Sequence, residues 1–139
     1  MMKVFLDTNI LIDYVDHRDK RAYAELILSM AEEGVITLFA SYLSYANMGY
    51  ILRKRTQEDR YRLISEARNM ATVVPCDARQ LDIALHHPVK DFEDMLQYQC
   101  ALAAGCDVVV TNNKQDFHEF CRLPFLTSEE FLLQFNYEG

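Results

Sequence analysis

Near its start the chain reads Val4-Phe5-Leu6-Asp7-Thr8-Asn9-Ile10-Leu11, a short apolar run that stops at an acidic residue. Further runs of strand length and strand-forming composition follow at Thr37–Ala40, Thr72–Val74 and Asp107–Thr111. Their apolar residues are continuous rather than alternating, which indicates strands that are buried on both faces. Such strands are typical of a parallel sheet that is covered by helices.

Helical patterns occupy the intervals between these runs. We predict a short helix at Ile10–Tyr14, a closing helix whose first turn is Ser128–Glu130, and longer helices at Arg21–Glu33, Tyr42–Lys54, Gln57–Asn69, Ala78–His86 and Asp91–Ala104. Gly105 stands where the last of these longer helices requires a left-handed cap. Strands that alternate with right-handed crossover helices form an α/β fold. We therefore predict a three-layer α/β/α sandwich with a central, mostly parallel sheet.

The composition fits a single domain over residues 1–139. Half of the residues in this 16.2 kDa chain are hydrophobic, which is enough to form one compact core. The 14 basic and 21 acidic residues give a net charge of −7, which argues against a surface that coats phosphates generally. No apolar stretch approaches the ~20 residues of a membrane span, and the first residues lack a secretory signal pattern. We expect a cytoplasmic protein without a membrane partner.

The four cysteines lack the spacing of a metal or redox motif. Cys76, Cys100, Cys106 and Cys121 lie in apolar surroundings, and no CxxC pair is present. Free cysteines are commonly buried, and cytoplasmic thiols stay reduced. We therefore expect four reduced thiols.

Acidic and amide side chains follow the predicted strands, at the edge where α/β folds bind ligands. Asp7 comes directly after the first strand and is followed by Thr8 and Asn9, although capping of the next helix would explain Asp7 equally well. A second group, Asp91-Phe92-Glu93-Asp94, opens a long helix. The helix dipole favours acids there, but three acids in four positions exceed that need. Asp91 and Asp94 share one helical face, whereas Glu93 is expected to point away from it.

A third acid reaches the same edge after the last predicted strand. Asp116 follows that strand through Thr111-Asn112-Asn113-Lys114-Gln115. Carboxylates that converge are stable only with a counter-charge, and a set of oxygen donors suits Mg²⁺ or Mn²⁺ rather than zinc. Such ions activate water for attack on a phosphodiester. The residues thus favour metal-dependent phosphodiester hydrolysis.

These motifs, in this order, resemble the PIN-domain family, and in particular the VapC-type toxins of bacteria. The resemblance is carried by Val4–Leu11, by Asp91–Asp94 at the start of a helix and by Val109–Phe117. It implies a Mg²⁺- or Mn²⁺-dependent ribonuclease that acts on RNA, is often a homodimer and is often neutralised by a small antitoxin protein. It also implies that Asp7, Asp94 and Asp116 are the catalytic, metal-binding acids, and that Asn113 is the polar residue three positions before the last acid.

The chain departs from the family pattern at two positions. Asn47 stands where the family usually has a Glu, and Asn112 stands where relatives often have an Arg. We expect Asn47 and Asp91 to be additional metal ligands. Asp91 or Glu93 could replace the missing charge, and Asp91 is favoured because it shares a helical face with Asp94. Thr8, Asn9, Glu93, Thr111 and Asn113 are expected to be supporting polar residues. The loss of a ligand charge leaves an alternative open: a PIN-like RNA- or protein-binding module with weakened catalysis.

Two surface features bear on binding partners. Basic residues gather at Arg53-Lys54-Arg55 and at Arg60, Arg62 and Arg68; a solvated helix face is the commoner reason, and a rim that guides phosphates is the alternative. The predicted helix at Tyr42–Lys54 has more large apolar side chains than one buried stripe needs. We expect a second copy or an antitoxin to cover part of the set Tyr42, Tyr45, Met48, Ile51 and Leu52.

Overall fold

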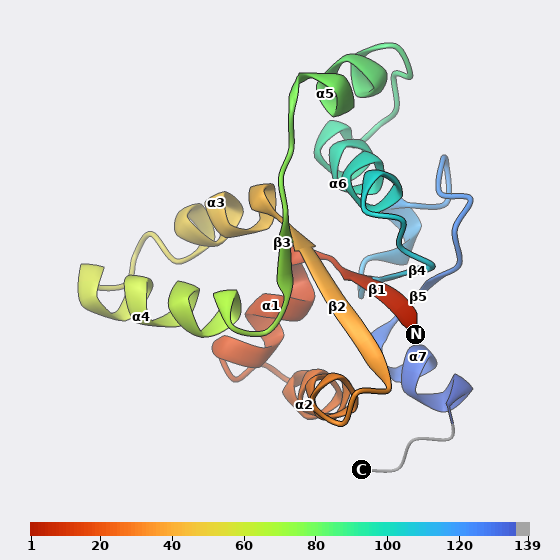
Figure 1. Ribbon diagram of the computed structural model, residues 1–139. Coiled ribbons are helices and arrows are strands. Elements are labelled where there is room, and N and C mark those ends of the chain that lie inside the picture. Colours follow the sequence, from red (N-terminus) through yellow and green to blue (C-terminus); the bar gives the residue numbers. More distant parts are fainter. Residues whose placement is uncertain (136–139) are drawn as a thin grey trace.

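The computed structural model describes residues 1–135 as strands and helices that alternate along the chain (Figure 1). The strands are β1 (Met2–Leu6), β2 (Ile36–Ser41), β3 (Thr72–Val74), β4 (Val108–Val110) and β5 (Phe125–Leu126). The helices are α1 (Thr8–Val15), α2 (Arg21–Glu32), α3 (Tyr42–Ile51), α4 (Gln57–Arg68), α5 (Ala78–Leu85), α6 (Phe92–Ala103) and α7 (Ser128–Gln134), with a short 3-10 helix at Lys114–Asp116.

The five strands form one sheet in the order β3-β2-β1-β4-β5, and every neighbouring pair is parallel. Phe5 is opposite Phe39 on one side and Val109 on the other, so β1 lies at the centre. The predicted parallel sheet is confirmed, and the four predicted strand runs form β1 to β4. The fifth strand was missed because two residues, Phe125 and Leu126, are too few to show a strand pattern.

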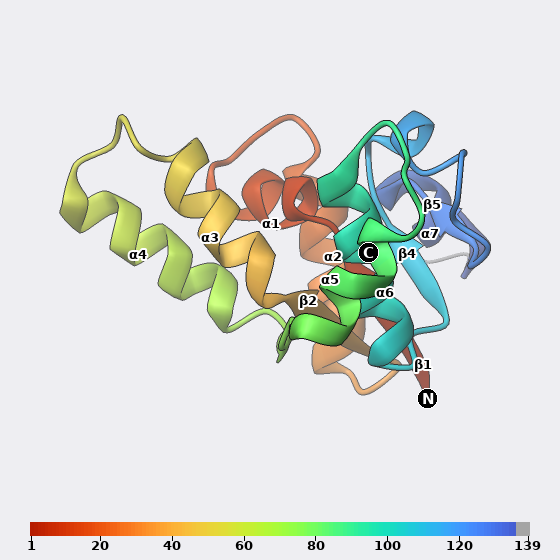
Figure 2. The same cartoon turned by 90° about the horizontal axis from the view of Figure 1, so that it is seen from above.

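Successive side chains of the strands enter two cores on opposite faces of the sheet. Val4 and Leu6 pack with residues of α1, α2, α4 and α7. Phe5 points to the other face and packs with Cys100 of α6 and with Phe117. Helices therefore cover both faces, with α5 against α6 on the second one, and the predicted α/β/α sandwich is confirmed (Figures 1 and 2).

Local sequence signals begin and end the helices as predicted. Asp7 caps α1 by accepting a hydrogen bond from the Thr8 backbone N–H. Thr127 and Glu130 form a capping box at the start of α7, and Gly105 has a φ of +70° just after α6. Figure 2 shows α3 and α4 side by side as a hairpin that extends from one side of the molecule. No helix within residues 1–135 has the length and apolar character needed to cross a bilayer.

Two of the cysteines are paired, which corrects the expectation of four reduced thiols. Cys76, in the segment between β3 and α5, forms a disulfide with Cys100 of α6, and their Cα atoms are 6.2 Å apart. The sequence could not show this pairing, because only the packing of α6 beside the end of β3 brings the two residues together. Cys106 and Cys121 are free thiols, and burial raises the pKa of each to about 11.

Candidate functional site

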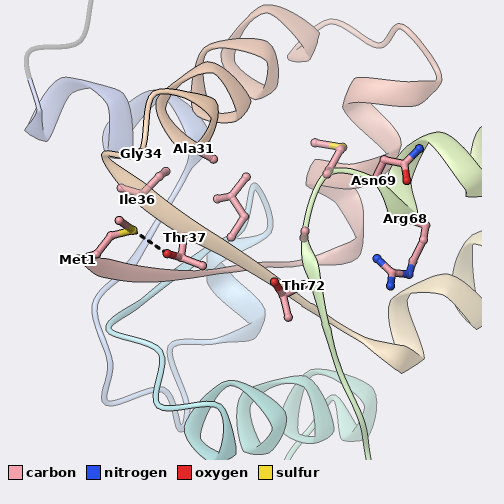
Figure 3. A pocket seen from close by; sticks show the side chains of 11 residues that line it. Met1, Ala31, Gly34, Ile36, Thr37, Arg68, Asn69 and Thr72 are labelled. Carbon is pink, nitrogen blue, oxygen red and sulfur yellow. Dashed lines mark hydrogen bonds between the residues drawn. The ribbon is translucent and has the colours of Figure 1, made fainter.

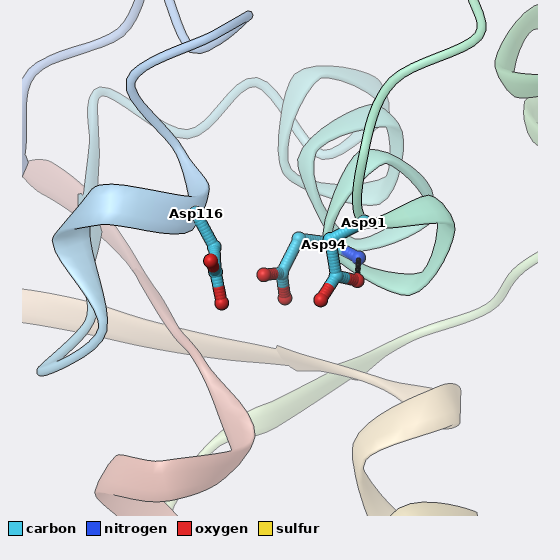
Figure 4. A group of neighbouring side chains, drawn as sticks. All are labelled: Asp91, Asp94 and Asp116. Atoms are coloured by element: carbon cyan, nitrogen blue, oxygen red, sulfur yellow. Dashed lines mark hydrogen bonds between the residues drawn. The ribbon is translucent and has the colours of Figure 1, made fainter.

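Three carboxylates converge at the carboxyl edge of the sheet (Figure 4). Asp91 and Asp94 come from the start of α6, and Asp116 comes from the 3-10 helix that follows β4. One carboxylate oxygen from each lies within 4.8 Å of the others. The expected meeting of Asp94 with Asp116 therefore takes place, and Asp91 joins them. This arrangement is a candidate cation site built only from oxygen donors.

Asp91 has two functions in this arrangement. It is the N-cap of α6, and its carboxylate accepts a hydrogen bond of 3.0 Å from the Asp94 backbone N–H. This cap fixes the first turn of the helix and with it the position of Asp94. Asp91 can therefore cap α6 with one part of its carboxylate and still belong to the group of converging acids.

Asp7 was expected to meet Asp94 and Asp116, but within residues 1–135 it is not among the three residues whose carboxylate oxygens lie within 4.8 Å of one another. It lines a cavity of about 220 Å³ together with Asp91, Glu93 and Asp94. Its own side chain is buried and accepts hydrogen bonds from the Thr8 N–H at 2.8 Å, the Thr111 hydroxyl at 2.8 Å and the Asn9 amide at 3.2 Å. These donors hold the carboxylate in place, although burial is the larger effect and raises the pKa of Asp7.

Burial and repulsion between carboxylates both act on Asp94. Only 7% of this residue is exposed, and burial together with the charges of Asp7, Asp91, Glu93 and Asp116 raises its pKa to about 8. Burial is the largest cause, and each neighbouring carboxylate adds repulsion. The protein without a cation therefore keeps a proton on this group near neutral pH, and a bound cation would remove the repulsion.

Short polar contacts position the last acid. The Asn113 side-chain amide donates a hydrogen bond to the Asp116 carboxylate, and the Asn113 backbone N–H donates to the Thr111 hydroxyl at 3.1 Å. Thr111 in turn donates to Asp7. Four of these neighbours were predicted as supporting polar residues. Three of them donate hydrogen bonds to Asp7 and one donates to Asp116, namely Thr8, Asn9 and Thr111 in the first group and Asn113 in the second.

Asn47 and Glu93 form a pair at the rim of the same cavity. The Asn47 side-chain amide donates a hydrogen bond of 2.8 Å to a Glu93 carboxylate oxygen. The expectation that Glu93 points away from the acids is wrong, because Glu93 reaches the cavity beside Asp7 and Asp94. Burial, followed by the charges of Asp7 and Asp91, raises the pKa of Glu93. Helical spacing alone did not reveal this, since a long side chain at the first turn can bend toward a partner on another helix.

A buried polar network beneath the acids was missed from the sequence. The Gln97 side-chain amide donates to the hydroxyl oxygens of Ser44 and Thr8, at 3.0 and 3.3 Å. Its carbonyl oxygen accepts from Ser41, and Gln97 is fully buried. The network ties α6 to α1 and α3 at the end of each that is nearest the acids. Its one sequence signal is that Gln97 follows Asp94 by three residues on the same helical face.

Asn112 supports the fold rather than the site. Its amide donates to Asp13 at 2.9 Å, and its carbonyl oxygen accepts from the Ser128 backbone N–H at 3.1 Å. The residue thus links the end of β4 to α1 and to the start of α7. Where relatives often have an Arg, this chain therefore has a residue that holds separate elements together.

The other basic and apolar residues singled out from the sequence are divided between core and surface. Met48 and Leu52 are buried in the core, Tyr45 is partly buried, and Tyr42 and Ile51 remain exposed. Most of the arginines belong to a solvated face: Arg62 pairs with Asp59 and Glu66 along α4, Arg55 pairs with Asp16, and Arg53 stacks on Tyr50. The commoner explanation for these basic residues is therefore favoured.

A wider hollow of about 470 Å³ lies at the other end of β2 (Figure 3). Its walls include Met1, Ile36, Thr37, Arg68 and Thr72, and no carboxylate lines it. The Thr37 hydroxyl contacts the Met1 sulfur at 2.8 Å within it. It lies beside the first residues of β2 and β3, whereas the acids gather at the carboxyl ends of the strands. The smaller acidic cavity is the better candidate.

The fold and the site define an α/β protein with an acidic centre at the carboxyl edge of a parallel sheet. The chain belongs to the PIN domain family, whose model matches residues 3–115. The resemblance inferred from the sequence is therefore confirmed.

Individual relatives agree with this assignment. The chain is 26% identical over 140 residues to Ribonuclease VapC1 of Aquifex aeolicus (strain VF5), with 96% of both proteins covered. Its structure is similar to the DNA-bound VapBC of Salmonella typhimurium, with a TM-score of 0.69, 19% identity and coverage of 92% of this chain and 99% of the other. A toxin-antitoxin complex from Klebsiella pneumoniae gives a TM-score of 0.61 at 20% identity, covering 90% and 97%. These structural likenesses show the fold.

Proposed function

We propose that this chain is a divalent-metal-dependent ribonuclease, a hydrolase of RNA phosphodiester bonds, and the toxin of a toxin-antitoxin pair. The observation that carries the proposal is the convergence of Asp91, Asp94 and Asp116 within 4.8 Å, with Asp7 lining the same cavity as two of them. The 26% identity to a protein named as a ribonuclease, along nearly the whole chain, supports the same activity.

The donor set fits Mg²⁺ or Mn²⁺. Asp94 and Asp116 would hold the ion, with Asp7 and Asp91 as the neighbouring ligands, and all of them offer the hard oxygen atoms that these ions prefer. Burial, followed by the charges of the neighbouring acids, raises the pKa of Asp94, and a bound cation would offset that repulsion. When bound, the ion would activate water and neutralise charge on the phosphate.

The chain's own residues keep this site in shape. Three hydrogen bonds orient Asp7, and Asn113 orients Asp116. Asn47 holds Glu93 at the rim of the cavity, so we propose Glu93, rather than Asp91, as the group that replaces the charge the family usually has on α3. Asp91 is engaged at the start of α6 as a cap, which makes it less free to move toward Asn47.

A cleavage assay tests this function. Purified protein is incubated with total RNA in Mg²⁺, in Mn²⁺ and with a chelator, and the RNA products are resolved on a gel. We expect cleavage that requires metal and is abolished in Asp94→Asn, because the substitution removes a charged ligand. Asp82→Asn is the matched control, since Asp82 is an exposed acid on α5 away from the cavity. Metal-independent binding of RNA without cleavage would favour a PIN-like binding module instead.

We propose that the partners are RNA, an antitoxin protein and a second copy of the chain, all in the cytoplasm. Large apolar side chains on α3 and α4 are exposed, namely Tyr42, Tyr50, Ile51 and Tyr61. A partner helix or a second copy would cover this surface. Analytical ultracentrifugation at high micromolar concentration tests the homodimer, and a monomer that recovers no partner from cells would contradict this assignment.

A further inference from the structure

The positively charged side chain of Arg18 lines the acidic cavity, and its ion pair is with Asp16 rather than with a proposed metal ligand. The cavity walls carry Asp7, Asp91, Glu93 and Asp94, and the only basic side chain among the residues that line it is Arg18. Within residues 1–135, the ion pair of Arg18 is with Asp16, outside the cavity, at 3.5 Å between Nε and Oδ2. Its side chain is 51% exposed. A guanidinium beside four acids that pairs with none of them remains available to an anion.

The loop between α1 and α2 places Arg18 at this position. His17 has a φ of +51°, a left-handed conformation that non-glycine residues rarely adopt. The Arg18 backbone N–H then donates to the Asp13 carbonyl at 3.2 Å, which closes the loop against the end of α1. Strained residues of this kind persist where the surrounding structure holds them, and they are frequent at functional sites.

Asp16 restrains the side chain as well. Its carboxylate contacts Arg18 through one oxygen and Arg55 through the other, and its side chain is only 15% exposed. Asp16 is therefore shared between two arginines and does not belong to Arg18 alone. Within residues 1–135 the ion pair of Arg18 uses Nε, which leaves the two terminal nitrogens of the guanidinium as further N–H donors.

We propose that Arg18 binds a phosphate of the RNA backbone at the entrance of the acidic cavity. This inference rests on the proposed function and adds the substrate-binding group that the acidic site needs. A net negative cavity repels a polyanion, and a fixed guanidinium offers two donors in the geometry that phosphate accepts. Arg18 would thus hold the strand beside the acids, so that the phosphodiester bond to be cut reaches them.

Salt-dependent binding of a short RNA tests this assignment. The probe is a fluorescent single-stranded RNA of mixed sequence, and binding is measured in the non-cleaving Asp116→Asn background over a range of NaCl concentrations. Loss of one phosphate contact lowers the slope of log affinity against log salt by about 0.7 for a single strand. We expect Arg18→Gln to show this decrease and to bind roughly tenfold more weakly at low salt.

Two matched variants separate a phosphate contact from a general charge effect. Arg18→Lys keeps the charge and should retain most of the slope. Arg62→Gln removes an equally exposed arginine that has two acidic partners on α4 and lines no part of the cavity, so its slope should equal that of the background. Melting temperature and Mn²⁺ affinity, measured for each variant, show whether the fold and the acidic site are intact.

The possible results distinguish failure of the Arg18 assignment from failure of the proposed ribonuclease function. If the slope for Arg18→Gln equals that of Arg62→Gln in the Asp116→Asn background, and the protein with Asp116 intact cleaves RNA, the role of Arg18 is overturned and the proposed function stands. A wild-type protein that neither binds nor cleaves RNA overturns both. A lower slope that Arg18→Lys restores supports the phosphate contact.

Discussion

Replacing Asp94 by Asn should stabilise the metal-free protein while it abolishes metal-dependent activity. The carboxyl group of Asp94 has a pKa of about 8 in the folded chain, against an ordinary value of 3.8. A carboxyl pKa that is raised by folding makes the native state bind the proton more tightly than the unfolded state. Its contribution to stability is therefore fully present below pH 3.8 and is lost as the pH rises toward 8.

The size of the effect follows from this shift. Between pH 3.8 and pH 7, each pH unit costs ~1.4 kcal/mol, so the native protein loses on the order of 4 kcal/mol at pH 7. Asn is neutral at every pH and avoids this loss. An unfolding entropy of ~2.1 cal/mol/K per residue converts 4 kcal/mol into a rise in melting temperature of about 14 °C for a chain of this length.

Thermal denaturation with a chelator measures the difference. We expect Asp94→Asn to melt about 14 °C above the wild type at pH 7. The difference should fall to roughly a third at pH 5, because the pH is then only about 1.2 units above the pKa of this carboxyl group in the unfolded chain. Asp82→Asn removes the same charge from an exposed position on α5 and should change little. Saturating Mn²⁺ should reduce the advantage, since the ion stabilises only the wild-type site. An Asp94→Asn protein that melts at or below the wild-type temperature in chelator would refute the proposed repulsion.

Three further outcomes are expected. Mn²⁺ should raise the melting temperature of the wild type but not of Asp116→Asn, and an equal rise with NaCl of matched ionic strength would indicate screening instead. Glu93→Gln should weaken Mn²⁺ binding in the wild type and do so less in an Asn47→Glu background, measured by calorimetry; strictly additive effects would count against replacement of the missing charge by Glu93. Cys76→Ser should lower the free energy of unfolding by ~3 kcal/mol without reductant, as the loss of a crosslink across this loop predicts, and by far less with reductant, as measured by urea denaturation.

Local patterns in the sequence were sufficient to predict the layers and the edge that carries the site. Continuous apolar runs at Val4–Leu6 and Val108–Val110 indicated buried parallel strands, and both form central strands of the sheet. Parallel strands end at a common edge, so Asp7 and Asp116, which follow them, were predicted to lie at the same edge of the sheet. The acids at the start of α6 follow the same logic, because the crossover helix must begin at that edge.

Contacts between separate elements could not be predicted, because they depend on how the elements pack rather than on local spacing. The pair of Asn47 with Glu93 joins α3 to α6 across 46 positions, and the disulfide of Cys76 with Cys100 depends on the same helix lying beside the end of β3. No sequence motif singled out Arg18, and only the folded α1–α2 loop places it at the cavity. The sequence by itself determined which elements form and where the acids lie along the chain. The tertiary structure decided which charges meet. The interaction of two charges depends on the distance between them in the folded protein, and their separation in the sequence does not determine that distance.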